Sequence, residues 1–154
     1  MEMPQLTAAH RHLDRIVGRW RGEERMLPSP WDPGGGTAIG RVRNAAALDG
    51  FAVVQEYEQE RGGAVTFRGH GVFRWDPSAS EYSLHWFDSL GLDPNHFRGT
   101  FDGDVLTLVS RGAQGFTRAV FDFGQPGRYA YRMDVSGDGA QWMPMMTGDY
   151  VRED

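Results

Sequence analysis

Few side chains in this sequence are of the types that perform covalent or metal chemistry. Cysteine is absent, and all 16 Lys+Arg residues are arginine. The lack of cysteine excludes disulfides, thiolate nucleophiles, iron–sulfur clusters and cysteine-based zinc sites. The lack of lysine excludes a Schiff-base mechanism and the phosphate-binding lysine of a P-loop.

Two of the five histidines offer one candidate site. If the turn between Trp75 and Ser80 has four residues, His70 and His85 become direct cross-strand neighbours, with Cβ atoms about 5 Å apart. Such a pair could form an acid/base or metal site. The alternative, which we favour, is a polar ladder of outward-facing histidines on the surface of a sheet.

No other motif indicates catalysis or metal binding. His10 and His12 are two residues apart on a predicted helix, so their side chains point to different faces. The sequence has no nucleophile elbow, no zinc-protease motif and no EF-hand loop. The three glycines at 34–36 precede a predicted strand rather than a helix N-terminus, which argues against a phosphate cradle. We therefore expect no metal and no cofactor.

Composition limits the range of partners. The net charge is −5, and no block of basic residues is available to neutralise phosphates, so we expect no nucleic-acid binding. No apolar run could span a bilayer, and residues 1–6 lack the basic and apolar regions of a secretory signal. These features favour a cytoplasmic protein with no membrane partner. A homodimer is left open.

Short runs of alternating apolar and polar residues recur along the chain and predict β-strands that position these residues. Each run ends at a turn signal such as Asp49-Gly50 or Asp102-Gly103. No helix-length segment separates the runs, so the strands should be antiparallel and joined by hairpins. We predict one all-β domain over residues 1–154, a roughly ten-stranded up-and-down barrel whose closure removes exposed edges. The predicted strands are 19–26, 37–48, 51–60, 65–75, 81–88, 96–101, 105–111, 116–123, 128–136 and 141–151.

A short helix over 8–17, capped by Thr7 and stopped by Gly18, is predicted to cover one end of the barrel. Two longer loops, 28–36 and 89–95, contain one Trp and two Leu. We expect these apolar side chains to pack over the barrel mouth; the alternative is a mobile lid over a ligand site.

Alternation along each strand separates two faces. One carries the glutamates and arginines of the middle strands, among them Glu56, Glu58, Arg68 and Arg74, and belongs in water. The other is apolar and aromatic and is predicted to face inward; it includes Phe73, Trp75, Tyr82, Leu84, Trp86, Phe121, Phe123 and Tyr131. The final strand is apolar on both faces, so its orientation is not predicted.

An aromatic interior with few polar groups is typical of an apolar ligand pocket, and equally of a filled core. About ten strands favour a cavity. The predicted ligand-binding residues are those of the inner face that combine aromatic surface with orienting polar groups: Gln55, Tyr57, Phe73, Trp75, Trp86, Asp88 and Tyr131.

Gly18 and Trp20, on the first strand after a short helix, resemble the Gly-x-Trp opening of lipocalins and other calycins. In such barrels a first-strand Trp commonly meets an Arg of the last strand. The resemblance therefore implies that Trp20 and Arg152 close the barrel.

Longer segments resemble one bacterial family, catalogued as domain-of-unknown-function family fifteen seventy-nine and similar to calycin-type barrels; they are 36–42, 55–57, 69–73, 82–89 and 148–152. The most specific is the His-Trp-Phe-Asp-Ser sequence that begins at His85. The resemblance covers nearly the whole chain and implies the fold but no established activity.

The opening is also similar to that of the haem-binding nitrobindins, whose pattern continues with Gly where this chain has Glu24. The iron-ligating His of that group lies near the C-terminus, whereas this chain has no His after His96. Haem binding is therefore not expected. The leading hypothesis is a barrel that binds a small apolar or aromatic molecule. The alternatives are an enzyme that uses Gln55, Tyr57, Asp88 or the histidines of the same cavity, and a structural or interaction module with a filled core.

Overall fold

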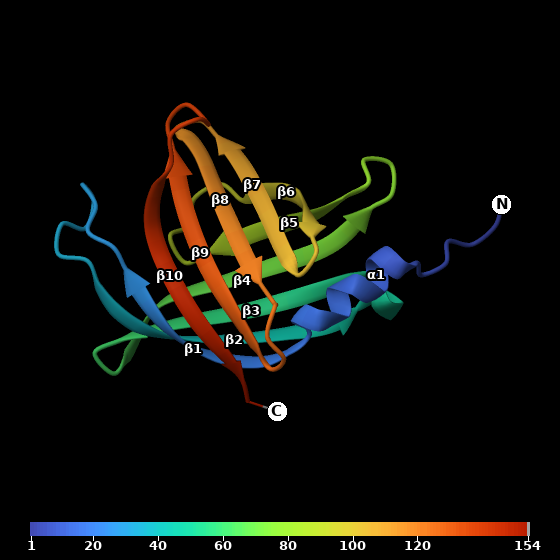
Figure 1. Cartoon of the computed structure of the whole chain (residues 1–154), viewed down its shortest axis with the longest axis horizontal. Coiled ribbons are helices and arrows are strands. Elements are labelled where there is room, and N and C mark those ends of the chain that lie inside the picture. Colours follow the sequence, from blue (N-terminus) through green and yellow to red (C-terminus); the bar gives the residue numbers. More distant parts are fainter. Residues whose placement is uncertain (154) are drawn as a thin grey trace.

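The computed structural model describes residues 1–153, in which ten antiparallel strands form a closed barrel (Figure 1). Each strand pairs with the next, and the last pairs with the first, so the prediction of an all-β up-and-down barrel is confirmed. The strands are β1 (Gly18–Met26), β2 (Gly36–Ala47), β3 (Ala52–Arg61), β4 (Ala64–Asp76), β5 (Glu81–Asp88), β6 (Asn95–Asp102), β7 (Val105–Gly112), β8 (Gly115–Asp122), β9 (Arg128–Ser136) and β10 (Met143–Arg152).

The seam between β1 and β10 joins the two residues that the family resemblance implied. Trp20 lies opposite Arg152 in the register, and the guanidinium lies 4.3 Å from the centre of the indole ring. Arg152 also donates a hydrogen bond of 2.7 Å to the carbonyl of Val17. The Trp20 indole in turn donates one of 3.0 Å to the carbonyl of Ile16. The seam is thereby tied to the segment that enters β1.

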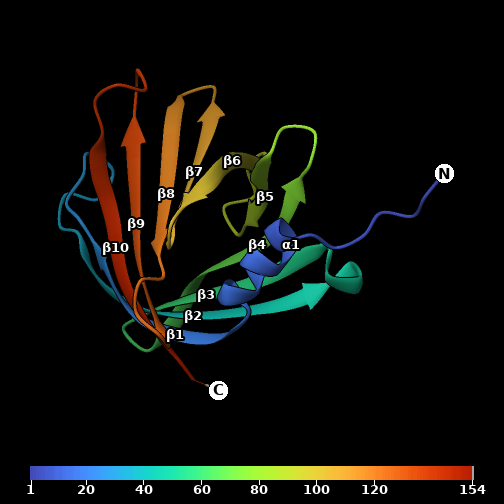
Figure 2. The ribbon, with the colours of Figure 1, turned by 45° about the vertical axis from the view of Figure 1, so that its right-hand side comes forward.

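The N-terminal segment covers one end of the barrel, at the opposite end from the β9–β10 connection (Figure 2). It differs from the single predicted helix, because α1 (Ala8–His12) is followed by a 3-10 turn, η1 (Leu13–Ile16). In a 3-10 turn, residues three apart lie above one another. Leu13 and Ile16 therefore both point into the barrel end, where they are 2% and 3% exposed. A second 3-10 turn, η2 (Leu48–Gly50), joins β2 to β3.

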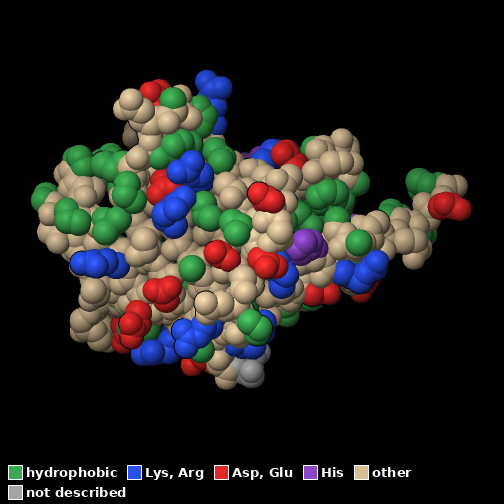
Figure 3. All heavy atoms as spheres, viewed as in Figure 1, with side chains coloured by type: hydrophobic (Ala, Val, Ile, Leu, Met, Phe, Trp, Pro, Cys, Tyr) green, Lys and Arg blue, Asp and Glu red, His purple; other side chains and the backbone are tan. Residues whose placement is uncertain are grey.

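The predicted assignment of inner and outer faces is confirmed. All eight residues predicted to face inward belong to the buried core or pack against it. On the outside, Glu58 and Arg68 form an ion pair between β3 and β4. Charged side chains of both signs are interspersed over the face seen in Figure 3.

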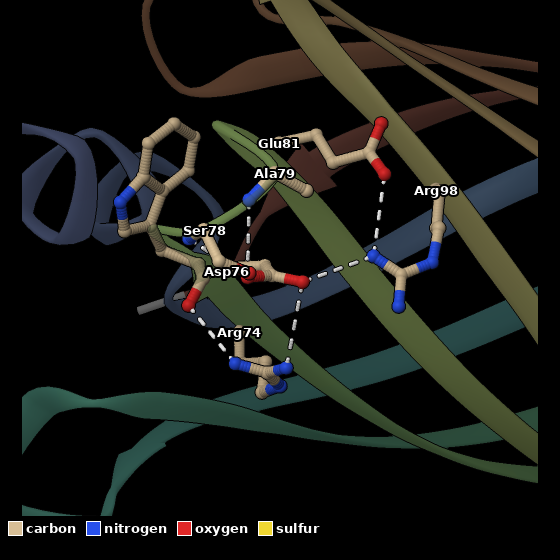
Figure 4. A network of polar contacts seen from close by, with 7 residues as sticks. Arg74, Asp76, Ser78, Ala79, Glu81 and Arg98 are labelled. Carbon is tan, nitrogen blue, oxygen red and sulfur yellow. Dashed lines mark hydrogen bonds and ion pairs between the residues drawn. The ribbon is translucent and has the colours of Figure 1, made fainter.

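A polar network on the outer face stabilises the β4–β5 turn (Figure 4). Asp76 accepts hydrogen bonds from the Ser78 hydroxyl and from the backbone N–H groups of Ser78 and Ala79. Arg98 bridges Asp76 and Glu81 at 3.1 and 3.2 Å. Hydrogen bonds from Ser78 and Arg98 lower the pKa of the Asp76 carboxyl to about 2.

This turn also corrects the predicted histidine pair. The four-residue turn begins after Asp76, one residue later than predicted, because the Asp76 side chain closes it. The β4–β5 register therefore differs by two residues, and His70 lies opposite Phe87. His85 instead stacks on His96 of β6, with ring centroids 4.3 Å apart. Both pairs lie on the outer face, as the ladder interpretation required.

Among residues 1–153, the structure has no helix that is long and apolar enough to cross a membrane.

Candidate ligand-binding cavity

The barrel is hollow at the end away from α1. The cavity has a volume of about 410 Å³. Its wall includes Met26, Asp88 and Met145, which lie at the strand ends farthest from the helix, and Leu90 of the β5–β6 connection. Leu84, Phe121 and Tyr129 belong both to the buried core and to the cavity wall, and so form its floor.

Glycines on the inner face of β4 keep this end open. Gly69 and Gly71 lie beside the indole of Trp86 on β5; a Cβ at Gly69 would lie 2.2 Å from that ring. The Trp86 ring therefore lies flat against the backbone of β4 instead of filling the centre of the barrel. Such close approach of a ring to a strand requires a residue without a side chain.

The Trp86 ring is held at its edge by Asp88. The indole N–H donates a hydrogen bond of 2.9 Å to Asp88, and the backbone N–H of Leu90 donates another of 3.0 Å to the same carboxylate. Both Trp86 and Asp88 line the cavity. The Tyr57 ring lies 6.2 Å from that of Trp86 and continues the aromatic wall.

A buried carboxylate lies behind the wall. Glu24 of β1 is 2% exposed and is not among the residues that line the cavity. It accepts hydrogen bonds from the hydroxyls of Tyr57 and Tyr150 and from the Gln59 amide, all three of which do line it. Space for the carboxylate comes from Gly40, where a Cβ would lie 2.2 Å from Glu24 Oε2.

This arrangement keeps the phenols protonated. Burial, followed by the charge of Glu24, raises the pKa of Tyr57 well above its usual value. Burial also raises the pKa of Tyr131 and Tyr129, to which the Glu24 charge contributes. The cavity wall therefore presents neutral hydroxyl groups.

Gln55 on β3 is a polar group of the cavity wall whose side chain, like the Tyr131 hydroxyl, forms no hydrogen bond with another described residue. Its side chain is 7% exposed and lines the cavity, and no residue in the described part of the chain forms a hydrogen bond with it. The amide lies on the cavity side of the strand. It is therefore available to hydrogen-bond with a molecule in the cavity.

Comparison with known proteins places the chain in a family. A family model described as "Protein of unknown function (DUF1579)" matches residues 5–152. The chain belongs to this family. A search of curated proteins finds no match.

Two solved structures share the barrel of this DUF1579 member. The crystal structure of Rv2717c from M. tuberculosis aligns with a TM-score of 0.73 and 14% identity, covering 97% of this chain and 100% of that one. The S-type phycobiliprotein lyase CPES from Guillardia theta aligns with a TM-score of 0.61 and 12% identity, covering 98% and 99%. At these identities the similarity concerns the fold alone.

The structure brings together five of the seven predicted ligand-binding residues of this family member, and they line the cavity: Gln55, Tyr57, Trp86, Asp88 and Tyr131. Phe73 and Trp75 do not. Phe73 lies below the floor and is 1% exposed. Trp75 packs against Tyr82 under the helix, with ring centroids 4.8 Å apart. Both lie on the predicted inner face, but they are near the end of β4 that is covered by the helix, where the barrel interior is filled.

Sequence reasoning did not place Glu24 or Gln59 at the site. Alternation along β1 gives the signal for Glu24, because Trp20, Gly22 and Glu24 occupy successive inward positions and are all buried. Gln59 follows Gln55 and Tyr57 at the same spacing. Their polarity argued for the outer face, and only the hydrogen bonds among them make the inward position favourable.

The apolar side chains of the two mouth loops were expected to pack over the cavity, and for Trp31 and Leu92 this prediction is wrong. Trp31 and Leu92 are 71% and 77% exposed, so neither covers it. Ser29 and Asp32 of the first loop and Leu90 of the second do reach the wall. Backbone hydrogen bonds between Ser29 and Asp32 fold the first loop on itself and leave the Trp31 ring outside.

The last strand, whose orientation was not predicted, owes its double apolar character to a β-bulge. The register with β9 shifts between Pro144 and Met146. The extra residue lets two consecutive side chains, Met145 and Met146, line the cavity.

Proposed function

We propose that this protein binds a small, largely apolar molecule in the cavity at the open end of its barrel. The observation that carries the proposal is the hollow of about 410 Å³ in which Gln55, buried on the wall, has no protein partner within the described residues. Pockets of this kind combine a predominantly apolar wall with a few polar groups that orient the ligand. Trp86, Tyr131 and four methionines supply much of the apolar surface. A phycobiliprotein lyase with a similar fold is consistent with a binding role for this type of barrel.

Acid–base catalysis in the same cavity receives less support. Glu24, the buried carboxylate, lies behind the wall and is occupied by three donors. The raised pKa of Tyr57 keeps its phenol protonated at neutral pH, where it cannot act as a base. We therefore favour binding without a chemical step.

Filling the cavity tests the proposal. Ala119 is buried on the cavity wall, so Ala119→Leu places additional carbon atoms in the hollow. Ala45 lies exposed on the outer face of β2, and Ala45→Leu is the matched control. The readout is the fluorescence of N-phenylnaphthylamine, a neutral apolar dye, titrated with each folded variant.

We expect the wild type and Ala45→Leu to bind the dye equally and Ala119→Leu to bind it about tenfold or more weakly, because the space is lost. Equal binding by all three proteins would place the dye elsewhere and contradict the proposal. Near-UV circular dichroism establishes that each variant is folded before its affinity is compared.

A further inference from the structure

The charged side chains on the cavity wall are carboxylates. Asp32 and Asp88 line it, and within residues 1–153 no arginine or histidine does. Asp32 lies 3.6 Å from Arg61, which balances its charge. Asp88 accepts hydrogen bonds from Trp86 and Leu90, both neutral donors, and no ion pair to it is found among the described residues. One carboxylate therefore faces the cavity near its mouth without a compensating cation.

The second source of negative charge is Glu24, behind the wall. Its three partners, Tyr57, Tyr150 and Gln59, are all neutral and all donate. The two hydroxyls and the amide can all donate to the carboxylate oxygens, and no ion pair to Glu24 is found among the described residues. The Glu24 charge contributes to the raised pKa of Tyr131, so its field reaches the cavity wall. A low-dielectric interior screens such a field weakly.

Aromatic rings on the cavity wall also favour a positively charged group. Trp86, Tyr57 and Tyr131 line the cavity, and the face of an aromatic ring carries partial negative charge that attracts cations. Trp86 and Asp88 are joined by a hydrogen bond, so the carboxylate lies at the edge of an indole ring that lines the cavity. A group with positive charge would meet both together.

We propose that the ligand is a hydrophobic amine, whose apolar body occupies the hollow and whose protonated nitrogen binds at Asp88 beside the Trp86 ring. This inference rests on the proposed function and narrows it to a class of ligand. An anionic amphiphile such as a fatty acid would bring a second carboxylate close to Asp88, where residues 1–153 place no cationic side chain on the cavity wall. Burying such a pair of like charges is strongly unfavourable.

Three ten-carbon ligands that differ only in the head group provide the test: decylamine, decanol and decanoate. Each is titrated against the wild-type protein loaded with N-phenylnaphthylamine, and the concentration that displaces half of the dye is measured. We expect decylamine to act at about tenfold lower concentration than decanol, because a charge-assisted hydrogen bond is added to the same apolar contact. Decanoate should be the weakest of the three. Added salt should reduce the ratio between the half-displacement concentrations of decanol and decylamine.

Variants assign the preference to one side chain. Asp88→Asn keeps the size of the residue and removes the charge, and should bring the potency of decylamine to within about threefold of that of decanol. Asp93→Asn is the matched control, because Asp93 is exposed on the β5–β6 connection that follows Asp88 and does not line the cavity. It should keep the wild-type preference.

The outcomes separate the two proposals. If decanol displaces the dye but decylamine is no better, the amine inference is wrong and the proposed function stands. Decanoate that binds as tightly as decylamine, or an amine preference that survives in Asp88→Asn, also overturns the inference. If the dye and decanol both fail to bind the wild-type protein, the proposed function itself fails.

Discussion

The helix end and the mouth end of the barrel carry similar aromatic side chains on their inner faces but use them differently. At the helix end Phe73, Trp20 and Leu106 are at most 2% exposed, and Leu13 and Ile16 close the barrel above them. At the mouth end the aromatic rings line a hollow of about 410 Å³. Residue composition alone therefore does not decide whether a barrel is filled.

Two local features account for the difference. The turn formed by Leu13 and Ile16 supplies large side chains at one end, whereas the mouth loops leave Trp31 exposed at the other. Beside the cavity, Gly69 allows the Trp86 ring to lie against the neighbouring strand, so a large side chain covers the wall rather than filling the space.

The largest expected contrast comes from truncating one phenylalanine at each end. Phe73→Ala removes a fully buried ring and should lower the free energy of unfolding by about 3–5 kcal/mol. Phe67→Ala enlarges a cavity that already exists, and should cost about 1 kcal/mol, since few contacts are lost. Urea unfolding of both variants measures the difference. Equal losses would mean that the mouth end is packed as tightly as the helix end.

A smaller effect should separate two tyrosines of the cavity. Tyr57→Phe removes a donor to the buried Glu24 carboxylate and should destabilise the protein by about 2 kcal/mol. Tyr131→Phe is the control, because its hydroxyl bonds to no other residue of the described chain; its cost should stay within about 0.5 kcal/mol. Thermal unfolding of the two variants compares them, and a Tyr131 variant less stable than the Tyr57 variant would contradict the role given to Glu24.

At the seam, Arg152→Met keeps an apolar side chain and removes the guanidinium. The loss of the contact with Trp20 and of the hydrogen bond to Val17 should lower the free energy of unfolding by about 1–2 kcal/mol. Denaturant titration checks this value, with dye affinity as the second readout. Because the seam contact lies away from the cavity, the affinity of the folded variant should be unchanged; weaker binding would show that the two ends are coupled.

The smallest predicted effect is the pH dependence of the β4–β5 turn at the helix end. The pKa of Asp76 falls from 3.8 to about 2 in the folded protein. Since the folded-state value is the lower one, the stabilisation is complete above the unfolded pKa and is lost as the pH falls toward about 2. Melting temperatures between mildly acidic and strongly acidic pH should therefore decline less steeply in Asp76→Asn than in the wild type. If the melting temperatures of the two proteins declined equally with falling pH, Asp76 would not be the source of the acid sensitivity.

The barrel, the strand faces and the closing pair could be predicted from sequence because each follows from local alternation or from a matched motif. Phe73 and Trp86 share an inner face and were predicted together on that ground alone. Their different surroundings could not be predicted, because the position of a residue along the barrel axis depends on the register of several strands. The register of β4 and β5 itself depends on the side chain of Asp76, which moves the turn by one residue.

The position of Glu24 could not be predicted from sequence for a different reason. Alternation along β1 favours an inward position for this residue and its charge favours an outward one, and no rule based on single residues decides between the two. Three partners from β3 and β10 settle the conflict, and these come together only in the closed barrel.

The β-bulge in β10 affects which insertions and deletions the protein can tolerate during evolution. The connection at 137–142 enters the sheet through the irregular step at Pro144, whereas the residues from Met146 onward keep a regular register with both neighbouring strands. A proline has no N–H to lose from the ladder there. Insertions or deletions in this connection can be absorbed at the bulge before they reach the seam. The mouth is thereby free to acquire new loop lengths while the pairing that closes the barrel is inherited intact.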